Sequence, residues 1–293
     1  MAPLPRRAFI AVTSASAKLF DGKETTGAFI SEALHPFQVF TAAGFEVDLA
    51  SETGKYTPDW LSLQPDFLAG EDLATYQDTA SAFRRKLDNM PRAADIDPDA
   101  YGVFFASAGH AALLDFPTAT DLQRIAESVW ARGGIVSSVC HGPAVFAHVV
   151  DRATGEPLIK GKTITGFTSE AEVVMKVDAE MKTWNRPLVE EHAATLGATC
   201  KRTPSGGRPC ANAEPRQARQ GHLGQLPHRR RTPHHRPEPP ERQVDGRGCC
   251  RGLRQALVSS SGLWEQGPRP GRRPSPGANL VICFRMTYSR RRG

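Results

Sequence analysis

Short apolar runs alternate with amphipathic stretches along the first 200 residues of the chain. Runs rich in β-branched and aromatic residues predict buried strands at Ala8–Thr13, Phe45–Ala50, Tyr101–Ala106 and Ile135–Val139. Apolar residues at helical spacing predict helices at Ser31–Ala43, Asp121–Ala131, Gly142–Val150 and Pro187–Leu196, a helical stretch over residues 72–90, and a loop at 91–98. Strands that alternate with helices in this way indicate an α/β fold with a mostly parallel sheet.

The chain changes its character near Cys200. Residues 1–200 hold 17 basic and 26 acidic residues, a net charge of −9, whereas residues 201–293 hold 20 basic and 5 acidic residues, a net charge of +15. The first part therefore has no electrostatic attraction for nucleic acid. The second part holds 12 of the 23 prolines, and runs such as Pro227–Arg242 have no apolar period. We expect an α/β domain over residues 1–200 and a largely disordered Arg/Pro-rich tail over 201–293.

The N-terminal segment and the number of cysteines indicate the cellular location to expect for the protein. The apolar run after Arg6 and Arg7 is too short to span a membrane, and no signal-peptide cleavage site follows it. Of the six cysteines, Cys140 alone lies within the first 199 residues. An internal disulfide or a cysteine-rich metal site is thereby excluded from that part. We expect a cytoplasmic protein without a membrane segment, and a nuclear pool stays open.

The segment Gly133–Val150, GGIVSSVCHGPAVFAHVV, carries the chemistry. A predicted strand runs into Cys140 and a predicted helix follows directly, which is the pattern of a nucleophile elbow. The helix N-terminus would favour a thiolate at Cys140. A buried structural cysteine is the alternative. The adjacent His141 and the Gly-Pro helix start favour the nucleophile.

Residues 139–144, VCHGPA, are similar to the Cys-His nucleophile motif of the ThiJ/PfpI superfamily. The branch with the greatest resemblance comprises the eukaryotic heat-shock, chaperone-like proteins with glyoxalase III activity. Further similar segments are residues 26–54, 107–117 and 164–172, and the resemblance covers about residues 7–200. It implies a flavodoxin-like sandwich, of the kind seen in class I glutamine amidotransferases, with helices on both faces of the sheet.

The resemblance also implies the roles of individual residues. Cys140 matches the nucleophile, and His141 matches the general acid/base. Glu172 matches the acid that orients the histidine, and Glu170 ranks second for this role. Glu32 matches a carboxyl that hydrogen-bonds the cysteine and relays a proton, and such a carboxyl should be partly neutral. The alternative for Glu32 is a solvated acid in the first turn of a helix.

A glycine-rich loop of the family resembles residues 107–117 here. The backbone N–H groups of Gly109 and His141 are expected to form the oxyanion hole. His110 lies in the same loop, where proton transfer and loop ordering are both open roles. Ala108 and Ala111 stand at two glycine positions of the family, and alanine resists positive φ.

The resemblance implies conversion of methylglyoxal to D-lactate without glutathione, metal or organic cofactor. The implied partners are a small 2-oxoaldehyde substrate and a second copy of the chain in a homodimer, with no specific nucleic acid and no membrane. A holdase chaperone, a deglycase that repairs aldehyde adducts, and an inactive product of a frameshifted gene are alternatives. A cysteine peptidase needs the same Cys–His–Glu set and is a fourth.

Residues 228–250 offer a test of the frameshift. When HRRRTPHHRPEPPERQVDGRGCC is back-translated and shifted by one base, the standard code allows IVDGRLITGQNPPSAKSTAEAVV. That peptide contains a strand, a turn and a helix start, and it resembles the end of the family's sequence. We infer a frameshift or a mis-spliced intron that begins between Cys200 and Arg229, which would remove the family's last sheet-edge elements.

Overall fold

A five-stranded parallel sheet forms the centre of the protein in the computed structural model, which describes residues 3–201 and 281–284. The strand order is β11-β6-β5-β1-β4. These strands are β1 (Arg7–Val12), β4 (Glu46–Ser51), β5 (Val103–Ala106), β6 (Ile135–Val139) and β11 (Val281–Phe284). β5 and β6 are buried along their full lengths, as parallel strands covered on both faces should be.

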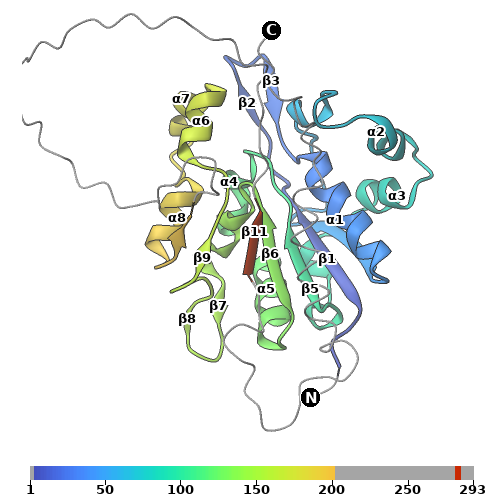
Figure 1. Ribbon diagram of the computed structural model, residues 1–293, viewed down its shortest axis with the longest axis vertical. Coiled ribbons are helices and arrows are strands. Elements are labelled where there is room, and N and C mark those ends of the chain that lie inside the picture. Colours follow the sequence, from blue (N-terminus) through green and yellow to red (C-terminus); the bar gives the residue numbers. More distant parts are fainter. Residues whose placement is uncertain (1–2, 202–280, 285–293) are drawn as a thin grey trace, which may run out of the picture.

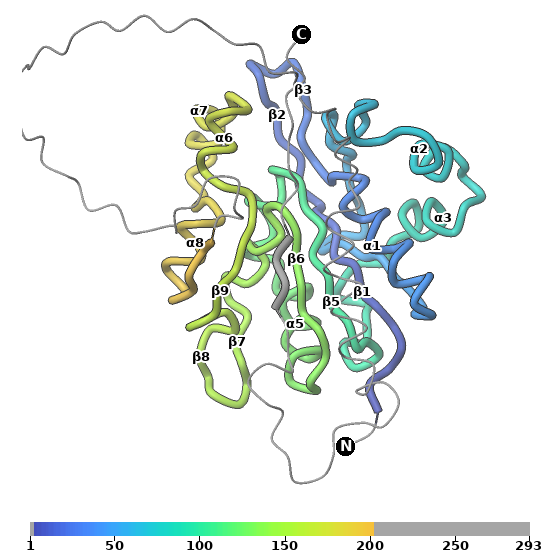
Figure 2. Tube along the Cα trace, in the orientation of Figure 1, coloured from blue at the N-terminus to red at the C-terminus, as the bar shows by residue number. Residues whose placement is uncertain are grey.

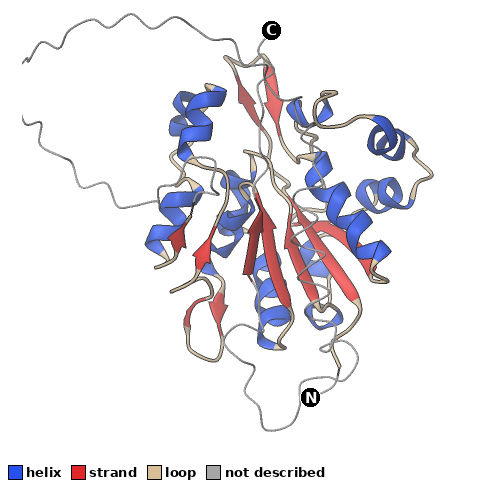
Figure 3. Cartoon of the chain, viewed as in Figure 1, coloured by secondary structure: helices blue, strands red, loops and turns tan. Residues whose placement is uncertain are grey.

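Helices cover both faces of this sheet, so the predicted α/β sandwich is confirmed (Figure 1, Figure 3). The helix α1 packs against β1 and β4, and α5 packs against β5 and β6. The helices are α1 (Ile30–Ala42), α2 (Gly70–Gln77), α3 (Ala82–Asp88), α4 (Ala112–Asp115), α5 (Thr120–Ala131), α6 (Ser169–Met175), α7 (Asp178–Thr183) and α8 (Val189–Thr195). Figure 2 shows α6, α7 and α8 beyond the β6 side of the sheet and α2 and α3 at its other side.

Short elements complete the described chain. The two-stranded pairs are β2 (Ala17–Leu19) with β3 (Glu24–Thr26), β7 (Val150–Asp151) with β8 (Glu156–Pro157), and β9 (Thr163–Ile164) with β10 (Thr199–Cys200). The 3-10 segments are Leu61–Leu63, Ala93–Asp95, Pro98–Ala100, Phe116–Thr118 and Gly142–His148. None of the helices within residues 3–201 and 281–284 has the length and apolar character that a membrane crossing requires.

The register of the strands sets the position of the candidate site. Ala11 pairs with Ala106, and Ala106 pairs with Ser138, so β1, β5 and β6 end at the same edge of the sheet. Segments that leave these strands therefore meet there. In open parallel sheets this carboxyl edge is where ligands bind.

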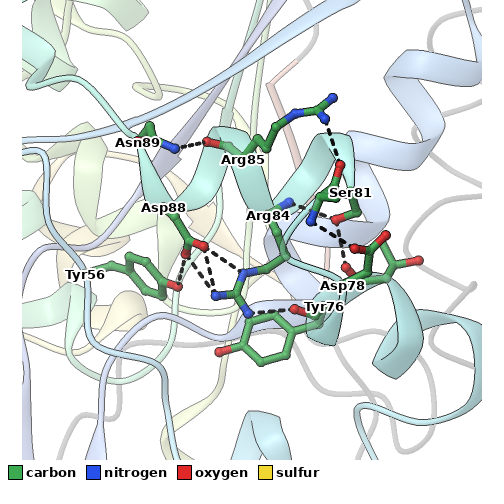
Figure 4. A network of polar contacts seen from close by, with 10 residues as sticks. Tyr56, Tyr76, Asp78, Ser81, Arg84, Arg85, Asp88 and Asn89 are labelled. Atoms are coloured by element: carbon green, nitrogen blue, oxygen red, sulfur yellow. Dashed lines mark hydrogen bonds and ion pairs between the residues drawn. The ribbon is translucent and has the colours of Figure 1, made fainter.

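Residues 72–90 are mostly helical, as predicted, but they form two separate helices, α2 and α3, and not one continuous stretch. Ser81 caps the second helix, and its hydroxyl accepts a hydrogen bond from the amide of Arg84 at 3.1 Å. Arg84 then pairs with Asp88 at 2.9 Å and lies over the ring of Tyr76 (Figure 4). Asp78 stabilises the turn between the two helices, because its Oδ1 atom accepts a hydrogen bond from the amide of Ala80 at 2.9 Å.

Two further expectations need correction. The helix expected at Gly142–Val150 is a 3-10 segment over Gly142–His148, in which the amide of Ala144 donates to the carbonyl of His141, three residues before it. The predicted disordered tail over residues 201–293 contains one strand, β11, whose four apolar residues pair in parallel with β6. The rest of the predicted disordered tail lies outside the described residues.

Candidate active site

Four segments bring buried polar side chains together at the carboxyl edge of the sheet. Glu32 lies in the first turn of α1, His110 follows β5, Cys140 and His141 follow β6, and Glu172 lies on α6. All five residues are buried, with exposures of 5% or less. Buried ionisable groups need partners, so the contacts among them define the site.

Cys140 occupies a strained turn between β6 and the 3-10 segment. Its φ of 56° lies in the left-handed region, which residues other than glycine seldom adopt. Gly142 makes the turn tight, because a Cβ atom there would lie 2.6 Å from the carbonyl oxygen of Ala106. The carbonyl of Cys140 accepts the amide of Phe167 at 2.8 Å. This turn has the strand-to-helix backbone geometry of the predicted nucleophile elbow, and the role of Cys140 as nucleophile stays a prediction.

His141 contacts the thiol through one ring nitrogen and a carboxylate through the other. Its Nδ1 atom lies 3.2 Å from Sγ of Cys140, and its Nε2 atom lies 2.7 Å from Oε1 of Glu172. Burial would raise the pKa of Glu172, but the attraction of His141 and His110 outweighs burial and lowers the pKa to about 2. The ionised carboxylate thus holds a proton on Nε2. Burial lowers the pKa of His141, which leaves Nδ1 able to accept the thiol proton.

The local fold selects one of the two candidate acids on α6. Thr168 caps this helix by accepting the amide of Ala171 at 3.3 Å, and the helix then turns Glu172 inward. Glu172 is 1% exposed, whereas Glu170 is exposed to solvent. The geometry thus favours Glu172 over Glu170 as the partner of His141, and its catalytic role stays a prediction.

His110 shares the same carboxylate, a contact that the sequence did not predict. Its Nε2 atom lies 3.0 Å from Oε2 of Glu172, and its ring centroid lies 4.5 Å from that of His141. The ring of Phe167 stacks on His141 at 4.7 Å and meets His110 edge-on at 5.4 Å. Burial would lower the pKa of His110, but the charge of Glu172 outweighs burial and raises it. His110 is therefore part of the polar cluster as well as of the loop.

Glu32 is buried against the thiol and is not the solvated acid of the alternative interpretation. Its Oε2 atom accepts the amide of Ala108 at 3.0 Å. Its Oε1 atom has no hydrogen bond of good geometry within the described chain, although the carboxyl interacts with the Cys140 thiol. Burial raises the pKa of Glu32 to about 8, so the carboxyl is mostly protonated at pH 7.

Cys140 does not rest as the thiolate that a helix N-terminus was expected to favour. Burial, followed by the negative charge that Glu32 carries once it ionises above its own pKa of about 8, raises the pKa of the thiol well above its ordinary value. The backbone N–H of His141 opposes this shift and is outweighed. The segment that follows is a seven-residue 3-10 turn, whose dipole is weaker than that of the predicted helix. The predicted role of this thiol as a nucleophile therefore requires a base beside it.

The loop after β5 has one position that requires glycine. Gly109 has a φ of 134°, and a Cβ atom there would lie 2.1 Å from the carbonyl oxygen of Gly27. Ala108 and Ala111 are not among the residues with positive φ, so alanine is tolerated at both family glycine positions. The amides of Gly109 and His141 stay predicted donors of the oxyanion hole.

Within residues 3–201 and 281–284, one group of side chains has the composition of a metal site. It consists of His110, His141 and Glu172, whose ligand atoms lie within 4.8 Å of one another. All three side chains are buried.

Comparisons with known proteins place this geometry in a family. No family model matches the chain. It is 47% identical over 193 residues to glyoxalase 3 of Candida albicans, an alignment that covers 66% of this chain and 82% of the relative. It is 45% identical over 194 residues to a glutathione-independent glyoxalase of Saccharomyces cerevisiae, again covering 66% and 82%.

The solved structures agree. The crystal structure of glyoxalase III from Candida albicans matches with a TM-score of 0.66 at 47% identity, over 68% of this chain and 83% of that one. A Francisella tularensis rapid encystment protein matches with a TM-score of 0.59 at 21% identity, over 69% and 85%, which supports the fold alone. With the Cys140–His141–Glu172 contacts at the carboxyl edge of its sheet, the chain belongs to the family of the glutathione-independent glyoxalases.

Proposed function

We propose that the chain is a glutathione-independent glyoxalase that converts a small 2-oxoaldehyde, methylglyoxal, into D-lactate. The observation that carries the proposal is the contact series from Sγ of Cys140 to Nδ1 of His141 at 3.2 Å and from Nε2 to Glu172 at 2.7 Å. A thiol, a base and an orienting acid in this order are what covalent attack on a carbonyl requires. The similarity to named glyoxalases supports the substrate class.

The first step forms a bond between sulfur and the aldehyde carbon. Nδ1 of His141 takes the thiol proton as Sγ of Cys140 attacks, and the ionised Glu172 stabilises the imidazolium that results. The aldehyde oxygen gains negative charge near the amides of Gly109 and His141, which are aimed at that position in our proposal. His141 then protonates this oxygen, which gives a hemithioacetal and restores the neutral imidazole.

The second step moves hydrogen from one substrate carbon to the next. His141 removes the C1 hydrogen as a proton while protonated Glu32 gives its proton to the C2 oxygen, and an enediol forms. His141 then returns a proton to C2, and the Glu32 carboxylate takes the proton of the C1 hydroxyl. The product is a thioester, and both residues regain their starting protonation states. The raised pKa of Glu32, about 8, suits a group that gives and takes a proton near neutral pH.

The third step releases the product. Water adds to the thioester carbonyl while His141 accepts a proton from it, and the same proton is given to the departing sulfur of Cys140. Overall the substrate gains one water molecule. Its C1 is oxidised and its C2 is reduced by the same two electrons, so no external oxidant or reductant is needed.

The homodimer and the cytoplasmic location stay predictions. A sedimentation measurement would check the first, and fractionation of cells would check the second.

The test is formation of D-lactate from methylglyoxal in the absence of glutathione, with residues 1–293 and two variants. Cys140→Ala should abolish product formation. Cys200→Ala, which alters the other buried cysteine of the described chain, should retain it. Product formation by the Cys140 variant would overturn the proposal. A silent wild-type chain would be retested with the reading frame restored after Cys200, and continued silence of the soluble protein would also overturn it.

A further inference from the structure

Glu172 contacts two histidines, whereas a carboxylate that only orients a catalytic base needs to contact one. One acid and one histidine suffice to hold the base beside Cys140, yet both carboxylate oxygens are occupied. Oε1 lies 2.7 Å from Nε2 of His141, and Oε2 lies 3.0 Å from Nε2 of His110. The side chains are 1%, 2% and 7% exposed for His141, Glu172 and His110.

The donor set points to one class of metal. Two imidazole nitrogens and one carboxylate oxygen suit zinc and other divalent first-row transition metals, whereas magnesium and calcium prefer oxygen ligands alone. Three protein ligands leave the fourth tetrahedral position for water. The three donor atoms already lie within 4.8 Å of one another, on segments fixed by β5, β6 and α6. Small side-chain movements would bring each to about 2.0–2.2 Å from a central zinc ion.

The nucleophile lies outside this set. Sγ of Cys140 contacts Nδ1 of His141, on the side of the ring away from the carboxylate. A metal ion at Nε2 would therefore be bound by the acid and the two histidines and not by the thiol.

We propose that His110, His141 and Glu172 bind a divalent transition-metal ion, zinc in particular, and that this ion switches the catalytic site off. The metal takes the place of the proton on Nε2 of His141. A neutral imidazole that binds metal through Nε2 carries its proton on Nδ1. Nδ1 then donates to the sulfur and cannot accept the thiol proton.

The inhibition has a distinctive form, and this part rests on the proposed glyoxalase function. The metal removes the base and draws Glu172 away from its orienting hydrogen bond, so proton transfer stops. The sulfur of Cys140 is not bound to the metal in this arrangement, so the ion does not add to the burial of the thiol. Zinc should consequently stop turnover without shielding Cys140 from alkylation. Ligation of zinc by the thiol itself would have the opposite effect on alkylation.

The chain supplies a matched control in the pair of His35 and Asp72. Nε2 of His35 lies 2.9 Å from Oδ2 of Asp72, much like the site pairs, but this pair is not part of any three-ligand group in the described chain. Replacement of His35 by glutamine removes an equivalent histidine and leaves the proposed metal site intact.

The experiment is a titration of the full chain with Co²⁺, a coloured substitute for zinc, followed by displacement with Zn²⁺. The wild-type chain should bind one more equivalent of Co²⁺ than His110→Gln does. If the variant still binds this Co²⁺ ion, the wild type should bind it at least about tenfold more tightly. The difference spectrum should show visible bands of a four-coordinate ion without thiolate-to-cobalt absorption. Cys140→Ala and His35→Gln should keep this equivalent. Thermal melts of each variant report whether it is folded.

A second measurement uses the wild-type chain alone. Zn²⁺ should abolish D-lactate formation, and a chelator should restore it, while iodoacetamide still modifies Cys140 in the zinc-loaded protein. Equal metal binding by wild type and folded His110→Gln would overturn the proposal, as would loss of the site in Cys140→Ala or protection of Cys140 by zinc. A chain that lacks glyoxalase activity would sink the proposed function, while the cobalt and alkylation results would still decide the metal site.

Discussion

Replacement of Glu32 by glutamine should stabilise the fold at neutral pH while it impairs catalysis. The pKa of this carboxyl rises from 4.5 to about 8 in the folded protein, chiefly through burial. At pH 7 the unfolded chain thus carries an ionised Glu32, and the folded chain carries a protonated one. Folding takes up a proton, so the contribution of this group to stability is fully present below pH 4.5 and is lost as pH rises to about 8.

The size of the effect follows from the shift. Each pH unit between the unfolded pKa and the working pH costs about 1.4 kcal/mol, so the cost at pH 7 is about 3 kcal/mol. Glutamine has a similar shape and no titrating proton, and its amide can keep the contact with the amide of Ala108 through its oxygen. The variant should avoid this cost but should lose the proton that Glu32 gives to the substrate in the proposed mechanism.

Urea unfolding of wild type and Glu32→Gln at pH 5, 7 and 8 measures the prediction. The stability advantage of the variant should grow by about 3 kcal/mol or more from pH 5 to pH 8. Glu170→Gln makes the same substitution at an exposed position and serves as the matched control. A difference between wild type and Glu32→Gln that is constant with pH would refute a buried, protonated Glu32.

Three other predictions test the site and its support. Glu172→Gln should lower kcat by about 10³-fold or more because the amide fails to hold the histidine as a base, with Glu170→Gln near wild type in the same D-lactate assay. Gly109→Ala should lose more than about 2 kcal/mol in thermal or urea unfolding because of its φ of 134° and its backbone contact, whereas Gly22→Ala, with open space around it, should lose less. Restoring the reading frame downstream of residue 200 should raise the melting temperature and the activity, and an unchanged or lower value of both would argue that the present tail is the native one.

The sequence predicts the central sheet well because buried parallel strands are continuous apolar runs. Ile135–Val139 and the turn at Cys140 could both be located from one such run and the Gly-Pro pair after it. The 3-10 geometry of Gly142–His148 could not, since three- and four-residue spacings leave similar apolar patterns. The strand β11 had a local indication, four apolar residues at Val281–Phe284, that the polar composition of the surrounding tail obscured.

The polar contacts of the site were less accessible to prediction. His110 and Glu172 are 62 residues apart, and no spacing rule indicates that they share a hydrogen bond. The protonation states also depend on depth of burial, which periodicity does not give for single polar residues. A helix start after Cys140 suggested a thiolate, whereas the surrounding low-dielectric environment and Glu32 favour the thiol.

The spread of the site along the chain has a consequence for biosynthesis. Glu172 lies 31 residues after His141, and the first residue of its helix, Ser169, donates hydrogen bonds to Glu190 on α8. Since chains emerge N-terminus first, the thiol leaves the ribosome well before its acid and the helix that braces it. In the nascent protein Cys140 therefore lacks the partners that the proposed attack on aldehydes requires until residues up to α8 have been made.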